Sequence, residues 1–144
     1  MCALPFVASA ATTSSFEISG WLPYWRGATS TNDVMPHLDE LTEVNPFIFT
    51  LKSDGTIVDN TKASDAASWT ALKSAAKAQK VRVIPTIMSS DGDLLHSLLS
   101  NSSKRVALED RIVALVKSGG YDGIDIDFEG KHAEDKVNFS TFLK

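Results

Sequence analysis

The chain has 144 residues, 43% of them hydrophobic, and a formal net charge of −4 at pH 7. This apolar content suits the core of one domain at most, and the negative charge leaves no basic surface for nucleic acid. The single cysteine, Cys2, excludes an intrachain disulfide and a cysteine-based zinc site, and no apolar run approaches the ~20 residues of a membrane span.

Residues 1–15 differ in composition from the rest of the chain. The stretch 1–7 is mostly apolar, and Ala8-Ser9-Ala10 has the small-x-small form of a signal-peptidase site. The apolar run is short and no positive region precedes it. We therefore expect either the back part of a secretory signal whose front is missing or a disordered leader, followed by one domain at 16–144.

Strand-like and helix-like segments alternate from Phe16 onward. Expected strands are 16–22, 45–51, 81–88 and the acidic stretch 121–130; expected helices are 33–44, 64–79, 93–99, 103–117 and one from 133 onward. Asp33 and Ser103 are the expected N-caps, and Gly119 the expected stop. Trp69, Leu72 and Ala76 form an apolar stripe on the second helix, and Val106, Ile112, Val113 and Val116 supply the apolar side of the fourth.

This order of elements predicts a parallel sheet covered by helices. Two architectures fit, an open doubly wound sheet and a (β/α)₈ barrel. No glycine-rich phosphate loop follows the first strand, which argues against a nucleotide-binding open sheet.

The stretch 121–130, Tyr-Asp-Gly-Ile-Asp-Ile-Asp-Phe-Glu-Gly, alternates acids and hydrophobes with a period of two. On an extended chain Asp125, Asp127 and Glu129 share one face. Strands disfavour acids, and like charges on one face repel, so an ordinary exposed acidic face is a weak explanation. An EF-hand calcium loop is also weak, because its twelfth position requires Glu and here holds Lys136. The pattern indicates carboxylates kept for chemistry.

The spacing Asp122-x-x-Asp125-x-Asp127-x-Glu129 resembles the DxxDxDxE signature of glycoside hydrolase family 18, the chitinase-like enzymes. The resemblance implies a (β/α)₈ TIM barrel with this motif on its fourth strand. Such a barrel needs about 250 residues, so 16–144 is expected to be the N-terminal half of a catalytic domain, with only the first four βα units. A half-barrel exposes sheet edges and a hydrophobic seam, so we expect poor stability alone or self-association of two halves.

The resemblance also assigns a role to each acid. Glu129 is the general acid and then the base that activates water, while Asp127 orients the acetamido group whose carbonyl oxygen attacks the anomeric carbon. Asp125 shares a proton or hydrogen bond with Asp127, and at least one pKa in this row should be raised because close carboxylates cannot all ionise. Asp122, with Gly123, precedes the strand and is expected to anchor the turn. No cofactor is implied.

Aromatic residues cluster after the first strand. Trp21, Tyr24 and Trp25 either form the wall of a sugar subsite or pack in the core and over a loop, and the residues leave both alternatives open. Tyr24 is the best candidate for a sugar contact because its hydroxyl adds a polar group. Phe47 and Phe49 are expected to fill the barrel interior.

Two further features qualify the resemblance. The family commonly carries Ser-x-Gly-Gly on the third strand, where this chain has Thr-Ile-Met-Ser at 86–89, so Met88 predicts an altered site shape and a different glycan preference. His37, His96 and His132 show no metal-ligand spacing, and we expect surface histidines and no metal site.

These features together predict a secreted or extracellular glycosidase that cleaves β-1,4-linked N-acetylglucosamine polymers, of the chitin or peptidoglycan type, by substrate-assisted retaining catalysis. Two alternatives remain. One is a non-catalytic, lectin-like glycan-binding protein on the same scaffold, although such relatives usually lose the terminal acid, which is present here as Glu129. The other is a fragment that is inactive because half of its site is missing.

Overall fold

A computed structural model of the chain describes residues 16–144; the predicted leader at 1–15 lies outside them. The strands are β1 (Trp21–Pro23), β2 (Glu43–Leu51), β3 (Ile57–Asp59), β4 (Arg82–Val83), β5 (Thr86–Ser89) and β6 (Asp125–Phe128). The helices are α1 (Ala28–Val34), α2 (Ala66–Gln79), α3 (Gly92–Leu99), α4 (Ser102–Gly119) and α5 (Lys136–Phe142). Short 3-10 turns cover Tyr24–Arg26, Met35–Glu40, Ala63–Asp65 and Ala133–Asp135.

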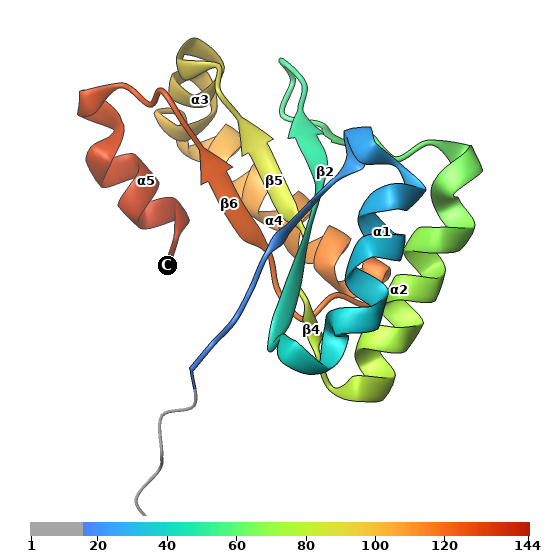
Figure 1. Cartoon of the computed structure of the whole chain (residues 1–144). Coiled ribbons are helices and arrows are strands. Elements are labelled where there is room, and N and C mark those ends of the chain that lie inside the picture. The colour runs from blue at the N-terminus through green and yellow to red at the C-terminus, as the bar shows by residue number, and fades with distance from the viewer. Residues whose placement is uncertain (1–15) are drawn as a thin grey trace, which may run out of the picture.

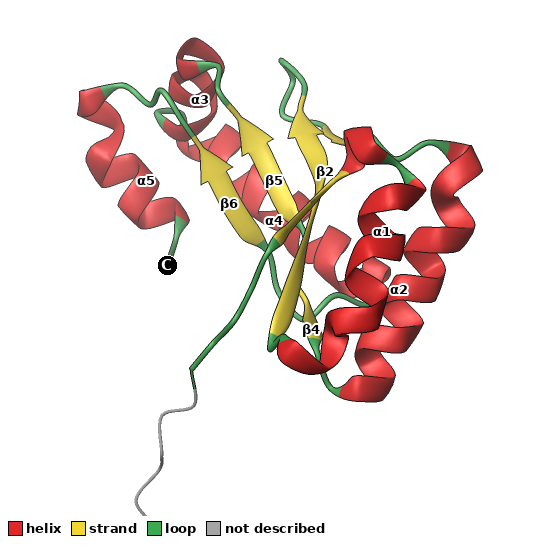
Figure 2. Ribbon diagram, in the orientation of Figure 1, coloured by secondary structure: helices red, strands yellow, loops and turns green. Residues whose placement is uncertain are grey.

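The main strands run parallel in the order β1-β2-β5-β6, and β3 adds an antiparallel hairpin to β2. Helices α1 and α2 lie beside β1 and β2, α3 and α4 lie behind β5 and β6, and α5 lies beyond β6 (Figures 1 and 2). Parallel strands joined through helices confirm the predicted fold class, with four βα units of a (β/α)₈ barrel present.

The core fills the space between the sheet and the helices. Leu72, Ile87 and Leu108, from α2, β5 and α4, are fully buried in one apolar cluster. The predicted stripe of Trp69, Leu72 and Ala76 on α2 is confirmed, since all three are buried. Among the described residues, no helix combines the length and apolarity needed to cross a membrane.

The helix predicted at 33–44 is wrong. Gly27, with φ of +55°, immediately precedes α1, which begins at Ala28, and the turn that contains Pro36 is a 3-10 helix. Asp33 is not a cap, because its carboxylate accepts a 2.6 Å hydrogen bond from Arg26. The last residues of the predicted helix belong to β2, which begins at Glu43.

The predicted strands also need adjustment. The first strand starts at Trp21 rather than Phe16, and Phe16 is 92% exposed. The strand predicted at 81–88 divides into β4 and β5 around Pro85, which has no N–H to donate to a neighbouring strand. The hairpin strand β3 was not predicted.

Helix α4 differs from its prediction at both ends and on its apolar side. Its N-cap is Asn101, whose side chain accepts from Lys104 N at 3.1 Å, rather than Ser103, and its C-cap is Gly120. Leu108 and Ile112 face the core. Val106 and Val113 are each 50% exposed, because they project from the opposite side of the helix.

The start of α3 packs against the loop after β6 backbone to backbone. A Cβ added at Gly92 would lie 2.3 Å from the carbonyl oxygen of Gly130, a contact that no side-chain rotation can relieve. The Gly92→Ala variant should therefore lose about 1–3 kcal/mol of unfolding free energy through overpacking. This exceeds the gain of at most about 1 kcal/mol that alanine brings to a helix.

Urea unfolding of the variant should show a lowered midpoint. Gly20→Ala is the matched control, because a Cβ there meets nothing within 4 Å. An unchanged or raised midpoint for Gly92→Ala would contradict the close contact.

Candidate active site

Most of the side chains expected to be functional converge on the sheet face that the helices of residues 16–144 leave uncovered (Figure 2). Pro23 pairs with Phe47, Phe47 with Thr86, and Thr86 with Asp125, so these four residues form a row across β1, β2, β5 and β6. One step toward the carboxyl ends of the strands, Met88 pairs with Asp127. In barrel folds this end carries the active site.

Asp125 is fixed by two donors from neighbouring strands. Its Oδ2 accepts a 2.8 Å hydrogen bond from the Thr86 hydroxyl and a 3.0 Å hydrogen bond from Trp21 Nε1. These bonds determine the orientation of the carboxylate at the start of the acidic row. Trp21 therefore has a polar partner in the site as well as a ring surface.

Asp127 stands next in the row and is only partly exposed. Burial raises the pKa of its carboxyl above 3.8, and the negative charges of Glu129 and Asp125 raise the pKa further. The ammonium group of Lys131 acts in the opposite direction and lowers it. Asp127 consequently holds its proton to a higher pH than an ordinary aspartate does.

A hollow of about 500 Å³ opens beside these acids. It is lined by Trp21, Pro23, Trp25, Phe47, Met88, Ser90, Asp127 and Glu129. Trp25 is 63% exposed and makes an edge-to-face contact with Phe47, with ring centroids 5.7 Å apart, so much of its ring surface is open to the hollow. The structure thus brings two carboxylates and two tryptophans of the predicted site to one cavity.

Four predicted residues lie outside the lining of this hollow. Asp125 lies at its base, held as described above. Tyr24 makes an edge-to-face contact with Trp25, with ring centroids 5.3 Å apart, and packs against the core.

Asp122 makes two hydrogen bonds with the backbone of Val83 in β4. Its carboxylate accepts from the Val83 N–H at 2.8 Å, and its own backbone N–H donates to the Val83 carbonyl at 3.0 Å. Gly123 lies next to the side chain of Ile84, so the chain entering β6 contacts the segment that connects β4 and β5.

A β-bulge in β2 separates the two phenylalanines that were expected to share the barrel interior. The register shifts between Phe47 and Phe49, so Phe47 lines the hollow while Phe49 packs in the helix-side core. Strict alternation placed both on one face, and no local signal in the sequence marks the bulge. Ser90 lines the hollow just beyond β5 and was not predicted. Only the tertiary fold brings it to this position, so the sequence holds no local signal for it.

Carboxylates thus lie at the carboxyl end of a strand in a parallel barrel sheet, beside exposed aromatic rings. The sequence profile described as "Glycosyl hydrolases family 18" matches residues 19–144. The chain belongs to this family.

Curated relatives match over a shorter region. The uncharacterized glycosylase YvbX of Bacillus subtilis is 37% identical over 54 residues, which are 38% of this chain and 16% of that protein. The putative sporulation-specific glycosylase YdhD of the same organism is 38% identical over 52 residues, 36% of this chain and 12% of that protein. The match thus spans less than a fifth of either relative.

Solved structures show the same fold over most of the chain. A class V chitinase from Pseudomonas fluorescens Pf-5 aligns with a TM-score of 0.77 at 19% identity, covering 88% of this chain and 39% of that one. The spore cortex-lytic enzyme SleL of Bacillus cereus aligns with a TM-score of 0.72 at 21% identity, covering 88% and 31%. At these identities the likeness establishes the fold alone.

The causes of the raised Asp127 pKa can be separated by substitution. Removing a neighbouring negative charge makes ionisation of Asp127 easier, so Glu129→Gln and Asp125→Asn should each lower its pKa, the former more. Lys131→Met removes a favourable positive charge and should raise it. Carboxyl ¹³C NMR titration of Asp127 measures all three shifts. A pKa that stays fixed in all three variants would show that the row is not electrostatically coupled.

Proposed function

We propose that this chain supplies the catalytic face of a glycosidase that cleaves β-1,4-linked N-acetylglucosamine polymers. The observation that carries the proposal is the common placement of Asp127 and Glu129 with the rings of Trp21 and Trp25 around one hollow, above an Asp125 held by two hydrogen bonds. Family membership adds the expectation of glycan hydrolysis. Chitin and peptidoglycan both contain the required sugar.

The proposed chemistry uses the substrate's acetamido group as nucleophile. Its carbonyl oxygen bonds to the anomeric carbon while the glycosidic carbon–oxygen bond breaks, and the leaving oxygen takes the proton of Glu129. Water then attacks the anomeric carbon, Glu129 takes back a proton, and the carbonyl is restored with net retention. Asp127 orients the acetamido group and stabilises the positive charge of the cyclic intermediate, and its raised pKa lets a proton be shared along the row.

The aromatic wall supports a sugar chain as the ligand. The apolar faces of pyranose rings pack on flat aromatic surfaces, and Trp21 and Trp25 are 59% and 63% exposed in spite of their size. Met88 and Phe47 extend this surface within the hollow. Met88 stands where many family members have glycine, which narrows the space beside the acids and favours a particular glycan shape.

We propose an extracellular or cell-wall location. The small-x-small sequence at residues 8–10 fits a secretory leader. One structural neighbour is a spore cortex-lytic enzyme, and one curated relative is a putative sporulation-specific glycosylase. An insoluble glycan outside the cell is the substrate consistent with these relatives.

The sheet edges support the proposal that another segment completes the site. Within residues 16–144, β6 pairs only with β5, and β1 pairs only with β2. Beside β6 an apolar hollow of about 330 Å³ includes Ile124, Ile126 and Leu143. Unpaired strand edges with apolar neighbours accept further strands, either from a second copy of this half-barrel or from additional chain.

The Glu129→Gln variant tests the proposed general acid. Its amide cannot donate the proton, so hydrolysis of a fluorogenic chitobiose substrate should fall at least about 100-fold, the low end of a general acid's contribution, while chitooligosaccharide binding persists. Glu40→Gln, on the exposed turn after α1, is the matched control and should leave turnover unchanged. Hydrolysis retained by Glu129→Gln refutes the assignment. Binding without turnover in the unsubstituted chain supports the lectin-like or incomplete-site alternative.

The aromatic wall is tested by Trp25→Ala. Loss of one stacking surface should weaken binding of chitotetraose by about tenfold, equivalent to about 1.4 kcal/mol, as measured by calorimetry or intrinsic fluorescence. Phe16→Ala is the matched control, since Phe16 is 92% exposed and takes no part in the hollow. Equal affinity of both variants and the unsubstituted chain would remove Trp25 from the binding surface.

A further inference from the structure

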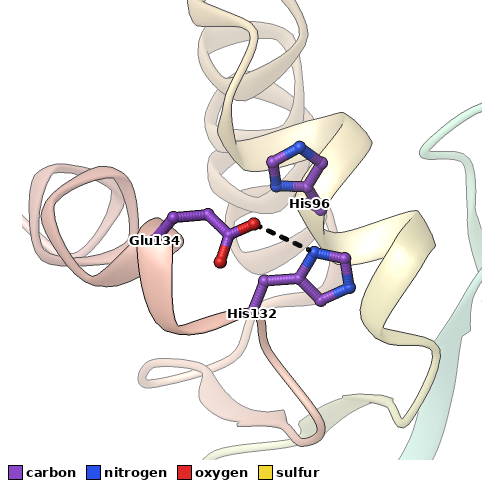
Figure 3. Close-up of side chains that lie close together, drawn as sticks. All are labelled: His96, His132 and Glu134. Atoms are coloured by element: carbon purple, nitrogen blue, oxygen red, sulfur yellow. Dashed lines mark ion pairs between the residues drawn. The ribbon is translucent and has the colours of Figure 1, made fainter.

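Two histidines that lie 36 positions apart in the sequence meet at the carboxyl end of the sheet. His96 of α3 and His132 of the loop after β6 stack with ring centroids 4.9 Å apart, and Glu134 lies beside them (Figure 3). One ligand atom from each of the three residues lies within 4.8 Å of the other two. The two histidines are therefore neighbours in space, which the expectation of scattered histidines did not predict, and both remain partly exposed at the surface.

Each imidazole ring is held by a carboxylate outside this triad. Both oxygens of Asp135 lie near His96 Nδ1, at 2.9 and 3.1 Å, and Asp135 is only 1% exposed. Asp93 Oδ1 lies 3.1 Å from His132 Nε2, which leaves His132 Nδ1 directed toward Glu134 Oε1 at 3.7 Å. Carboxylates that orient histidine rings in this way are characteristic of protein metal sites.

We propose that His96, His132 and Glu134 bind a divalent transition-metal ion of the zinc type. Two imidazoles and one carboxylate are ligands that zinc accepts, with a fourth position left for water. Tetrahedral bonds of 2.0–2.2 Å place ligand atoms roughly 3.3–3.5 Å apart. The ligand atoms lie within 4.8 Å of one another, so the three side chains must draw closer when an ion binds, and the exposed Glu134 and the two partly exposed histidine rings have room to rotate.

The excess of negatively charged groups around the two imidazole rings favours a cation bound between them over two neutral rings alone. Asp93, Glu134 and Asp135 bring three carboxylates to two imidazoles. A buried carboxylate such as Asp135 requires a positive charge or several donors nearby. The alternative, two independent histidine–carboxylate ion pairs, explains the individual contacts but predicts no stoichiometric metal binding.

The two segments that carry the ligands are fixed before any ion binds. Gly92, which begins α3, packs directly on the Gly130 carbonyl, and the backbone N–H of Glu129 donates to Ser89 O at 2.9 Å. His132 follows Glu129 by three positions. A bound ion therefore ties the loop that follows the proposed general acid to the adjacent helix, and acts as a structural clamp.

Zinc titration of the metal-free full chain tests the site. Calorimetry should show one ion bound per chain, and zinc should raise the thermal unfolding midpoint, because the ion binds only the folded arrangement. Cys2 is itself a zinc-type ligand, so Cys2→Ser serves as the background for every measurement.

Substitutions assign the binding to these residues. His96→Gln and His132→Gln should each weaken zinc binding at least about tenfold, and Asp135→Asn by about ten- to a hundredfold as the group that orients His96. His37→Gln is the matched control, because this third histidine is exposed and paired only with Glu40 among the described residues, and it should bind zinc normally.

Circular dichroism identifies any variant that fails to fold, and the folded variants at the other ligand positions then carry the assignment. Cobalt substitution gives a second readout, since a visible absorption spectrum that is lost in His96→Gln places the ion at this ring. No stoichiometric binding by the Cys2→Ser chain, or equal zinc affinity in the His96, His132 and His37 variants, would overturn the proposal.

Discussion

The register of β6 against β5 is the constraint on which the whole candidate site depends. Thr86 faces Asp125 and Met88 faces Asp127, so the acids project from the face that no helix covers. A shift by one residue would turn the acids toward the helices, where burial without partners is costly, and would expose Phe128. The hydrogen bonds from Thr86 and Trp21 to Asp125 form only in the observed register, so they help to select it.

The two faces of β6 have opposite energetic roles. Phe128 is 4% exposed and packs near Phe139 and Phe142 of α5, with ring centroids 6.3 and 5.7 Å away. This burial offsets the cost of the acids on the other face, where desolvation first and then repulsion from Glu129 and Asp125 raise the pKa of Asp127. The strand can thus hold close carboxylates because its apolar side anchors it to the helix layer.

Local patterns located much of the fold, whereas tertiary contacts decided the details. The alternation of acids and hydrophobes identified β6, and helical periodicity identified α2 and its buried stripe, because these signals lie within one element. The bulge between Phe47 and Phe49, the 3-10 turn before β2 and the Asn101 cap had no comparable signal. The contact between His96 and His132 also could not be predicted from their spacing in the sequence, because it depends on the packing of α3 against the loop after β6.

The position of the candidate site explains why a half-barrel holds both its acidic residues and its aromatic residues. Successive parallel units place β1, β2, β5 and β6 side by side, so the aromatic residues after β1 reach the acids of β6 across only two strands. The Trp21–Asp125 hydrogen bond joins residues 104 positions apart and links the first and last strands of this series. The bond requires all four strands to be in place, so the acidic site is complete only in the folded half-barrel.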